Sequence, residues 1–244
     1  MEKAIQVDIF IPCFIDQLFP ETGINMVKVL EKLGCTVHYN KNQTCCGQPS
    51  CNSGFQDEAR AIAKKFCKDF GHSEHYIVAP SGSCVGYIAN QYDHLLKNAA
   101  EYNTFKKIKP RLFEFADFLV TVLQTTSVNA VFPAKATYHD GCGSLRECHI
   151  KSQPRQLLEQ VKGLSLTEMK ECETCCGFGG TFAVKYETIS IGMAQTKVES
   201  ALAVDAEYII SSDLSCLMHL DAYIKKQNIP LKTMHIADIL ASGL

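Results

Sequence analysis

Apolar residues in the first half of the chain follow two spacings, one typical of buried strands and one typical of amphipathic helices. Short runs rich in β-branched residues predict strands at residues 6–12, 36–39 and 76–79. Apolar positions three or four residues apart predict helices at residues 23–33, 57–70 and 112–123. The turn-rich segments between them, at residues 43–53 and 80–86, are expected to be loops.

The second half repeats this order. Strands are expected at residues 136–139 and 208–211, and helices at residues 153–161 and 188–203. Alternating strands and helices favour parallel sheets with helices packed on them. The sequence therefore predicts the α/β class, with two pseudo-symmetric half-domains that each contain a short parallel sheet flanked by helices.

The chain reads as a tandem duplication. The tripeptide Cys-Cys-Gly occurs at residues 45–47 and again at 175–177, so the two copies lie 130 residues apart. The segment YIVAPSGSC, which ends at Cys84, is matched by YIISSDLSC, which ends at Cys216. Because such self-similarity at a fixed offset is the signature of a repeat, we predict half-domains at residues 1–130 and 131–244, which meet near residues 129–133.

Composition and charge narrow the classes of function. Of the 244 residues, 46% are hydrophobic and 20% are charged, which is ordinary for a globular protein. The formal net charge of −2 gives no electrostatic reason to expect nucleic acid as a partner. No apolar run approaches the roughly 20 residues that span a bilayer, and the first residues lack the pattern of a signal peptide. We therefore expect no transmembrane segment and a cytoplasmic location.

Thirteen cysteines in a reducing compartment do not indicate a disulfide framework. Eight of them form four matching pairs, with one member of each pair in each half. Each lies either just after a predicted strand or in a Cys-Cys-Gly loop. In parallel sheets this edge, beyond the carboxyl ends of the strands, is where ligands bind. Each half thus offers four thiolates, which suit iron–sulfur clusters and zinc. The two sets are Cys13, Cys45, Cys46 and Cys84, and then Cys142, Cys175, Cys176 and Cys216.

The adjacent cysteines favour a cluster over a single metal ion. Neighbouring side chains normally point apart, so both thiolates would reach one small ion only with difficulty, whereas a cluster has room for both. Gly47 and Gly177 allow the backbone to turn tightly beside the cluster and to offer N–H groups to its sulfides. We expect one iron–sulfur cluster per half, of the 4Fe-4S type, with zinc in one half as the alternative.

These cysteine spacings resemble the tandem cysteine-rich CCG domain found in heterodisulfide reductase and in the iron–sulfur component of glycolate oxidase. The contexts IPCFIDQLFPE, TCCGQP, HDGCGSLRE and TCCGFGGTFAVKY most resemble the lactate utilization protein A family. The resemblance implies an iron–sulfur electron-transfer subunit of a multi-protein complex that oxidises L-lactate, or a similar 2-hydroxy acid, to the 2-oxo acid. It also implies a ferredoxin-like iron–sulfur partner subunit and a third small subunit.

One departure from the family pattern leaves two other functions open. The pattern ends in Cys-x-x-Cys, but Ser81 replaces its first cysteine in one half and Asp213 does so in the other. The resemblance to heterodisulfide reductase implies five thiolates per cluster, so four per half count against a heterodisulfide-reductase-like thiol–disulfide oxidoreductase. A zinc-stabilised binding module without enzymatic activity is the other alternative. Ser81 and Asp213 could also donate an oxygen ligand to a metal.

The other cysteines and three polar residues are weaker candidates. Cys35, Cys67 and Cys148 are expected to serve only in packing. Cys51 and Cys172 could be substitute ligands or redox-active thiols. His139 is interpreted either as a hydrogen-bond donor to the cluster or as a strand-end histidine, and Asp16 either as a neighbour of the cluster or as a helix cap. Arg146 either offsets the cluster's charge or is solvated. No phosphate-binding loop or hydrolase motif is found, so no catalytic residue is assigned.

Overall fold

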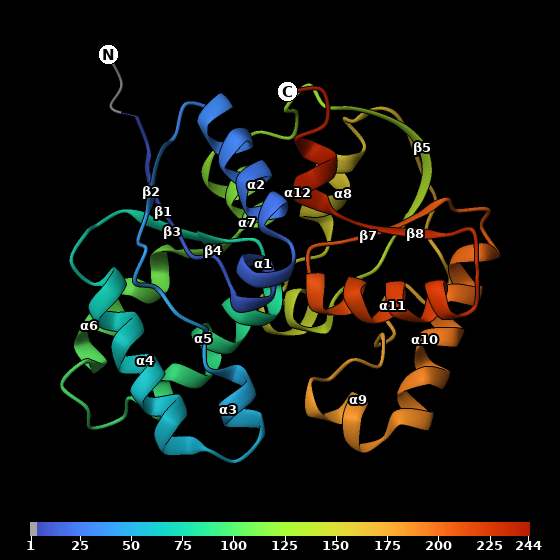
Figure 1. Ribbon diagram of the computed structural model, residues 1–244. Coiled ribbons are helices and arrows are strands. Elements are labelled where there is room, and N and C mark those ends of the chain that lie inside the picture. The colour runs from blue at the N-terminus through green and yellow to red at the C-terminus, as the bar shows by residue number, and fades with distance from the viewer. Residues whose placement is uncertain (1–3) are drawn as a thin grey trace.

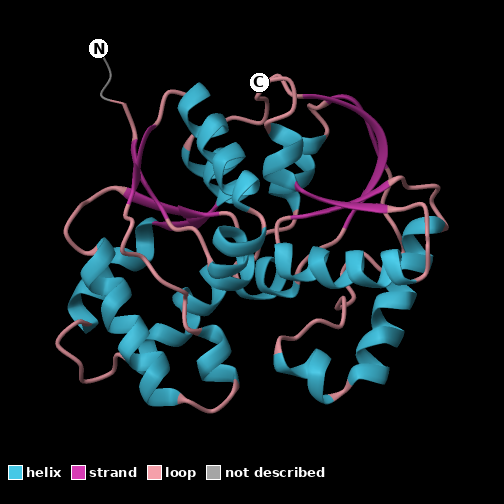
Figure 2. Cartoon of the chain, in the orientation of Figure 1, coloured by secondary structure: helices cyan, strands magenta, loops and turns pink. Residues whose placement is uncertain are grey.

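The computed structural model describes residues 4–244, and these residues form two four-stranded sheets with helices on both faces (Figure 1, Figure 2). All strand pairs in the first sheet are parallel, and the strands lie in the order β2-β1-β3-β4. Their bounds are Gln6–Ile9 for β1, Thr36–Tyr39 for β2, Tyr76–Ala79 for β3 and Leu112–Glu114 for β4.

The second sheet repeats the first. It is also parallel throughout, and its order, β6-β5-β7-β8, is the same pattern of crossovers. Its strands are β5 (Val131–Tyr138), β6 (Lys162–Leu166), β7 (Tyr208–Ser211) and β8 (Lys232–His235). The predicted α/β class, with two half-domains that each contain a short parallel sheet flanked by helices, is confirmed.

Helices connect the strands in both halves. Those of the first half are α1 (Cys13–Leu18), α2 (Pro20–Lys32), α3 (Gln48–Asn52), α4 (Gln56–Phe70), α5 (Gly82–Leu95), α6 (Tyr102–Ile108), the short 3₁₀ turn η1 (Lys109–Arg111), α7 (Phe115–Asp117) and the π-helical turn η2 (Phe118–Val122). Those of the second half are the π-helical turn η3 (Gly143–Glu147), α8 (Ser152–Leu158), α9 (Thr181–Lys185), α10 (Glu187–Leu202), α11 (Leu214–Lys226) and α12 (Ile236–Leu240). Among these described helices, none is both long and apolar enough to cross a membrane.

The two halves share a core. Buried residues of α2 and α7 pack together with those of α8 and α12, so that helices from both halves lie between the two sheets. On the outer face of the first sheet, α4, α5 and α6 enclose a second apolar cluster, while α10 and α11 cover the second sheet. The division into half-domains at residues 1–130 and 131–244 stays a prediction.

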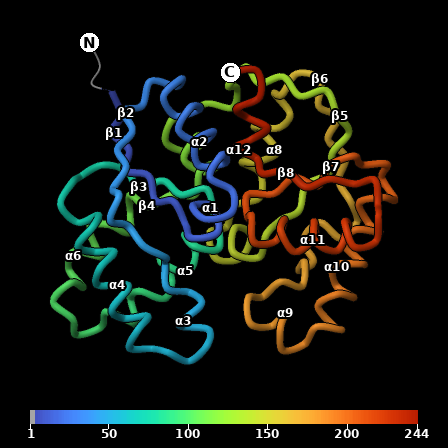
Figure 3. The backbone as a smooth tube through the Cα atoms, viewed as in Figure 1, coloured from blue at the N-terminus to red at the C-terminus, as the bar shows by residue number. Residues whose placement is uncertain are grey.

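The halves also meet through the helices that follow their central strands. α5 packs against η3, and α1 lies beside α11 (Figure 3). The ring of Phe14 in α1 also meets that of Phe178, in the loop before α9, with centroids 5.8 Å apart. The contact between α5 and η3 is so close that only glycine fits at two positions. A Cβ at Gly82 would lie 1.8 Å from Ser144 Oγ, and one at Gly143 would lie 2.5 Å from the Cα of Ser83. This arrangement pairs a helix from each half twice, as pseudo-two-fold symmetry requires.

Several predicted elements were confirmed and three were wrong. The strands predicted at residues 36–39, 76–79 and 208–211 have those bounds. The helix predicted at residues 112–123 is instead β4, α7 and η2: the Glu114 carboxylate accepts the N–H groups of Ala116 and Asp117, so the helix begins only after Glu114. The loop predicted at residues 80–86 contains the start of α5 at Gly82, because Ser81 caps that helix. The loop predicted at residues 43–53 contains the short helix α3, which has a proline in its first turn.

Candidate metal centres

The first four predicted cysteines come together at one edge of the first sheet. Cys13 opens α1 just after β1, and Cys84 lies in the first turn of α5 just after β3. β1 and β3 are neighbours in the sheet, and their connections leave it in opposite directions, which creates a crevice at their carboxyl ends. Cys45 and Cys46 enter this crevice on the loop between β2 and α3.

The sulfur atoms of this first quartet contact one another in sequence. The Sγ atoms of Cys13 and Cys45 are 3.7 Å apart. The thiol of Cys46 bridges those of Cys45 and Cys84. The expectation that the adjacent cysteines would point apart is therefore wrong for Cys45 and Cys46, whose thiols interact. Cys46 and Cys84 are buried, while Cys13 and Cys45 are half-buried.

The second quartet repeats these contacts at the corresponding edge of the second sheet. The thiol of Cys142 contacts that of Cys175, and the thiol of Cys176 bridges those of Cys175 and Cys216. Cys216 occupies the first turn of α11, as Cys84 does in α5. Cys176 and Cys216 are buried, whereas Cys142 is exposed. The structure thus brings together all eight predicted cysteines in two groups of four, and metal binding by these groups stays a prediction.

One cysteine in each quartet is set up to be a thiolate. Hydrogen bonds from the thiols of Cys13 and Cys46 lower the pKa of Cys45 to about 3. In the second half, Cys142 and Cys176 lower the pKa of Cys175 to about 2 in the same way. The donors are correspondingly held as thiols: the pKa of Cys13 and that of Cys142 are raised, chiefly by these hydrogen bonds. Thiolates are the form that binds metal.

The glycine after each cysteine pair contributes to this state. Gly47 and Gly177 have φ angles of +89° and +95°, in the left-handed region that favours glycine. The N–H group of Gly47 donates to Cys45 Sγ, and that of Gly177 donates to Cys175 Sγ, each over 3.4 Å. The backbone therefore turns so that an amide stabilises the thiolate sulfur.

The residues that replace the fifth cysteines bind each other across the two halves. Asp213 Oδ1 lies 3.5 Å from Ser81 Oγ, and Asp213 also accepts hydrogen bonds from the backbone N–H and the hydroxyl of Ser83, each at 2.9 Å. Asp213 is buried, and burial raises its pKa. Both replacements are thus engaged in the interface between the halves, which disfavours them as oxygen ligands.

Neither Cys51 nor Cys172 is part of a quartet's chain of sulfur contacts. Cys51 lies in α3 and interacts with the side chain of Gln56, with its Sγ 3.7 Å from Gln56 Oε1. The thiol of Cys172 lies instead near the carboxylates of Asp140 and Glu173, a second group of potential metal ligands. Their roles stay open. Cys35 and Cys67 are buried in apolar clusters, and Cys148 is half-buried beside the second of these, so the packing role predicted for all three agrees with their positions.

Of the three polar candidates, His139 lies against the second quartet. One ring nitrogen of His139 and the sulfur atoms of Cys176 and Cys216 all lie within 4.8 Å of one another. Burial lowers the pKa of His139 to about 3, so the ring is neutral. Asp16 and Arg146 are exposed. The N-cap residue of α1 is Pro12, so the interpretation of Asp16 as a helix cap was wrong.

Two cations near the second quartet, the buried Lys197 and the half-buried Arg155, were missed in the sequence. Lys197 is 1% exposed, and its Nζ is held by the carbonyls of Glu171 and Cys172. Asp140 lies two residues before Cys142, and both of its carboxylate oxygens accept hydrogen bonds from the guanidinium of Arg155, at 2.9 and 2.8 Å. A signal for Lys197 was present: within the predicted helix it falls on the same stripe as Ser190, Ala194 and Ala201, the face that packs inward.

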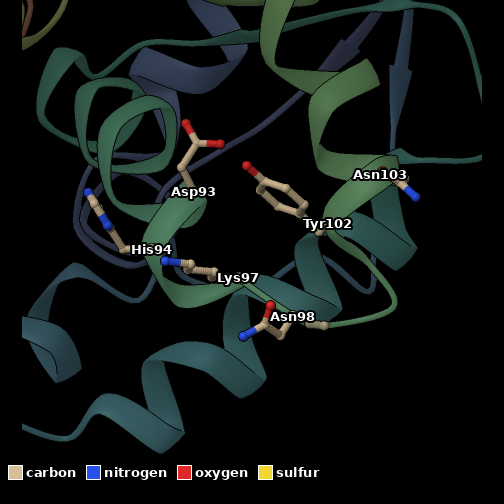
Figure 4. Close-up of a pocket in the computed structure, with 7 residues that line it drawn as sticks. Asp93, His94, Lys97, Asn98, Tyr102 and Asn103 are labelled. Carbon is tan, nitrogen blue, oxygen red and sulfur yellow. The ribbon is translucent and has the colours of Figure 1, made fainter.

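One pocket lies away from both quartets. It has a volume of about 510 Å³ and lies at the C-terminal end of α5, with Asp93, His94, Lys97 and Tyr102 among its walls (Figure 4). Cys84 is at the opposite end of this 14-residue helix, a length of roughly 20 Å. The pocket therefore has no direct access to the cysteines.

Each quartet fits an iron–sulfur cluster by the chemistry of its donors. Four thiol sulfurs converge from three separate segments, and one of them is a stabilised thiolate with an amide N–H directed at it. Cys84 and Cys216 lie in the first turns of α5 and α11, where the helix dipole favours negative charge. Four thiolates are the usual ligand set of a four-iron cluster.

Comparisons with known proteins agree with this organisation. A family model described as "Cysteine-rich domain" matches residues 7–89 and 136–221, one segment in each half. Lactate utilization protein A 2 of Bacillus cereus strain Q1 is 39% identical over 241 residues, covering 98% of this chain and 99% of its own. Lactate utilization protein A of Exiguobacterium sp. is 42% identical over 240 residues, covering 98% of each chain.

One solved structure is similar in fold. A hypothetical protein from Helicobacter pylori superimposes with a TM-score of 0.67 at 12% identity over all of this chain. This chain spans half the length of that protein. At such low identity the similarity supports the fold alone.

Proposed function

The chain belongs to the lactate utilization protein A family, and from that premise we propose that it is an iron–sulfur electron-transfer subunit. It would serve a multi-protein complex that oxidises L-lactate, or a similar 2-hydroxy acid, to the 2-oxo acid. The observation that carries the proposal is the repetition of one arrangement: four sulfurs in the same order of contact, with one stabilised thiolate, in each half.

The chain's own residues would hold one cluster in each half. Cys45 and Cys175 supply a thiolate at neutral pH, and Gly47 and Gly177 stabilise it through their N–H groups. A bound iron–sulfur cluster would supply one-electron redox chemistry. The buried cysteines of each quartet keep water from one side of the site, while the exposed Cys142 leaves an edge that a redox partner can approach.

The position of the quartets suits electron transfer between them. The helices that begin at or just before Cys13 and Cys216 pack on each other, and η3, which follows Cys142, packs on α5, which carries Cys84. Each quartet therefore lies next to the interface between the halves.

No hydride-transferring cofactor site was recognised in the sequence, so oxidation of the 2-hydroxy acid is assigned to partner subunits. These are a ferredoxin-like iron–sulfur subunit and a third small subunit, with all three in the cytoplasm.

Metal analysis of anaerobically purified protein tests the proposal. We expect iron and acid-labile sulfide, with broad visible absorbance. Cys45→Ser and Cys175→Ser should each remove about half of the iron, because each disrupts one of two four-cysteine sites. Cys35→Ser is the matched control: Cys35 is buried in the shared core outside both quartets, so its iron content should stay unchanged. Unchanged iron in both quartet variants would refute the ligand assignment.

Zinc in the second half is the alternative that a specific observation favours. His139, Cys176 and Cys216 form a buried group with the mixed nitrogen and sulfur donors typical of structural zinc sites. The same analysis decides between the two, since zinc alone, without sulfide, would overturn the electron-transfer function. The disulfide-reductase alternative is less well supported, because Ser81 and Asp213 stand where its additional thiolates would be.

A further inference from the structure

The two halves differ in what lies behind their quartets. The buried positions of α4 and α10 correspond one to one, each pair 131 residues apart: Ala59 and Ser190, Ala63 and Ala194, Phe66 and Lys197, Cys67 and Val198, Phe70 and Ala201. Phe10 and His139 also correspond, because their backbone N–H groups donate to Val78 and Ile210, on the equivalent strands β3 and β7. Two aromatic residues of the first half are thus a histidine and a lysine in the second.

In the first half the residues at the two corresponding positions, Phe10 and Phe66, are apolar. The ring of Phe10 meets that of Phe66 edge-on, with centroids 5.2 Å apart, and that of Phe70 at 5.8 Å. All three residues are buried in the same cluster as Cys46 and Cys84. They offer neither a charge nor a conventional hydrogen-bond donor to the first quartet.

In the second half, His139 has a donor with nothing to receive it. His139 is fully buried, and neither ring nitrogen has a hydrogen-bond partner among residues 4–244. The nearby carbonyl of Cys172 already accepts two hydrogen bonds, from the N–H of Asp140 at 3.0 Å and from Lys197 Nζ at 3.2 Å. A carbonyl has two lone pairs, so it has none left for His139. The sulfurs of Cys176 and Cys216 lie within 4.8 Å of one ring nitrogen and are acceptors that remain available to it.

Lys197 brings a buried positive charge to the same place. Its Nζ is held by two backbone carbonyls and makes no salt bridge within the described part of the chain, and the neighbouring carboxylate of Asp140 is paired with Arg155. Burial lowers the pKa of Lys197, while the neighbouring thiols of Cys172, Cys176 and Cys216 and the carboxylate of Asp140 act in the opposite direction. A buried cation is costly unless a negative charge lies nearby, and a thiolate-bound cluster supplies one.

We propose that His139 and Lys197 give the second quartet's cluster a higher reduction potential than the first quartet's cluster, an inference that rests on the proposed function. A hydrogen bond to sulfur and a nearby positive charge both stabilise the state with one more electron. Phe10 and Phe66, at the corresponding positions, supply neither. When one electron is added to the pair, it therefore resides in the second half.

A redox titration monitored by electron paramagnetic resonance tests this on the full chain, after iron and sulfide have been measured in each sample. Wild type should show two midpoint potentials. His139→Phe, which installs the first half's residue, and Lys197→Met should each lower the higher potential only. The expected shift is at least a tenfold change in the ratio of reduced to oxidised centres, about 59 mV for a one-electron couple. His139→Gln, which keeps an N–H donor, should retain most of the wild-type potential.

Phe66→Met is the matched control, because it makes an apolar exchange at the position equivalent to Lys197 and should shift neither potential by as much. Two centres whose potentials do not respond to His139→Phe or Lys197→Met would overturn the inference and leave the proposed function intact. Selective loss of iron from the second half in His139→Phe would also overturn it, since His139 would then be a ligand. Wild type without iron and sulfide would overturn both.

Discussion

Glu114 is a buried carboxyl group whose charge state the fold controls. It is 1% exposed at the end of β4, and its Oε2 accepts the N–H groups of Ala116 and Asp117, while Oε1 has no partner among residues 4–244. Burial raises its pKa to about 8. Since the unfolded value is near 4.3, the folded state binds the proton more tightly, and this contribution to stability is lost as pH rises from about 4.3 to about 8.

Glu114→Gln should therefore flatten the pH dependence of stability. The glutamine keeps an oxygen to accept the two N–H groups but cannot ionise. We expect its free energy of unfolding to exceed that of wild type increasingly as pH rises, by a few kcal/mol above pH 8, since one pKa unit is worth about 1.4 kcal/mol. Urea unfolding at pH 5, 7 and 9 measures this. The exposed Glu31→Gln is the control, and equal pH slopes in wild type and Glu114→Gln would contradict the assignment.

At this scale the sequence predicted residue types better than their surroundings. The eight cysteines were found by repetition, because a duplicated pattern is visible without a structure. The importance of Lys197 was not recognised, because a lysine in a helix is normally solvated. Its burial depends on α10 facing the second quartet. His139 was given two equal interpretations. The sequence could not decide between them, because its unpartnered nitrogens are a property of three-dimensional packing.

The Cys-Cys-Gly loop is the element that sets the geometry of each quartet. A Cβ at Gly177 would lie 2.6 Å from the backbone oxygen of Ser190, whereas one at Gly47 would meet the side chain of Ile62 at 3.2 Å. Gly34, which follows α2, has a similar φ of +85° and nothing within 4 Å of such a Cβ. The three positions share a backbone conformation and differ in the space around it.

The corresponding alanine variants should lose stability in that order. Gly34→Ala should cost about 1–2 kcal/mol, the cost of the left-handed conformation alone. Gly47→Ala should cost somewhat more, and Gly177→Ala the most, because a backbone carbonyl cannot move aside as a side chain can. Thermal or urea unfolding ranks them, and iron content should fall in Gly177→Ala but not in Gly34→Ala. Equal losses at all three positions would show that steric contact with the loop is unimportant.

Elements were predicted correctly where the spacing of apolar residues determines them. They were missed where a helix cap determines where the element begins. β3 and β7 are short runs of β-branched and apolar residues between turns, and both had the predicted bounds. The start of α5, which carries Cys84, was interpreted as a turn after the strand, and α11, which carries Cys216, was not predicted. Helix caps and turns use the same residues, and Ser81-Gly82-Ser83 fits either. Only the apolar stripe further along α5 distinguishes a helix from a turn here.

At the scale of the whole molecule, the sequence predicted two equivalent halves but not how they join. The repeat implied two sheets of the same order, as observed. The joining surfaces depend on contacts between residues more than 100 positions apart, such as Thr22 Oγ1 and Asn25 Nδ2 with the carboxylate of Asp238, at 2.9 and 3.0 Å. Such pairs have no spacing pattern that could reveal them.

Asp213 tests how the halves depend on each other. It is buried in the second half and accepts the backbone N–H of Ser83 in the first turn of α5, as well as the hydroxyls of Ser83 and Ser215. Asp213→Ala would leave that N–H group without its partner across the interface. We expect a loss of about 1–3 kcal/mol in the free energy of unfolding.

A double-mutant cycle between Asp213→Ala and Ser83→Ala should show coupling of roughly 0.5–3 kcal/mol, because the two residues share hydrogen bonds across the interface. Asp213→Ala with Ser215→Ala is the matched cycle within one half, and separates the loss of a local hydrogen bond from the loss of an inter-half contact. Folded Asp213→Ala should retain its iron, since the carboxylate is engaged by Ser83 rather than free to bind metal. Iron lost from the second half of a variant that unfolds like wild type would instead identify Asp213 as an oxygen ligand, and the second centre would then have a donor set that the first lacks.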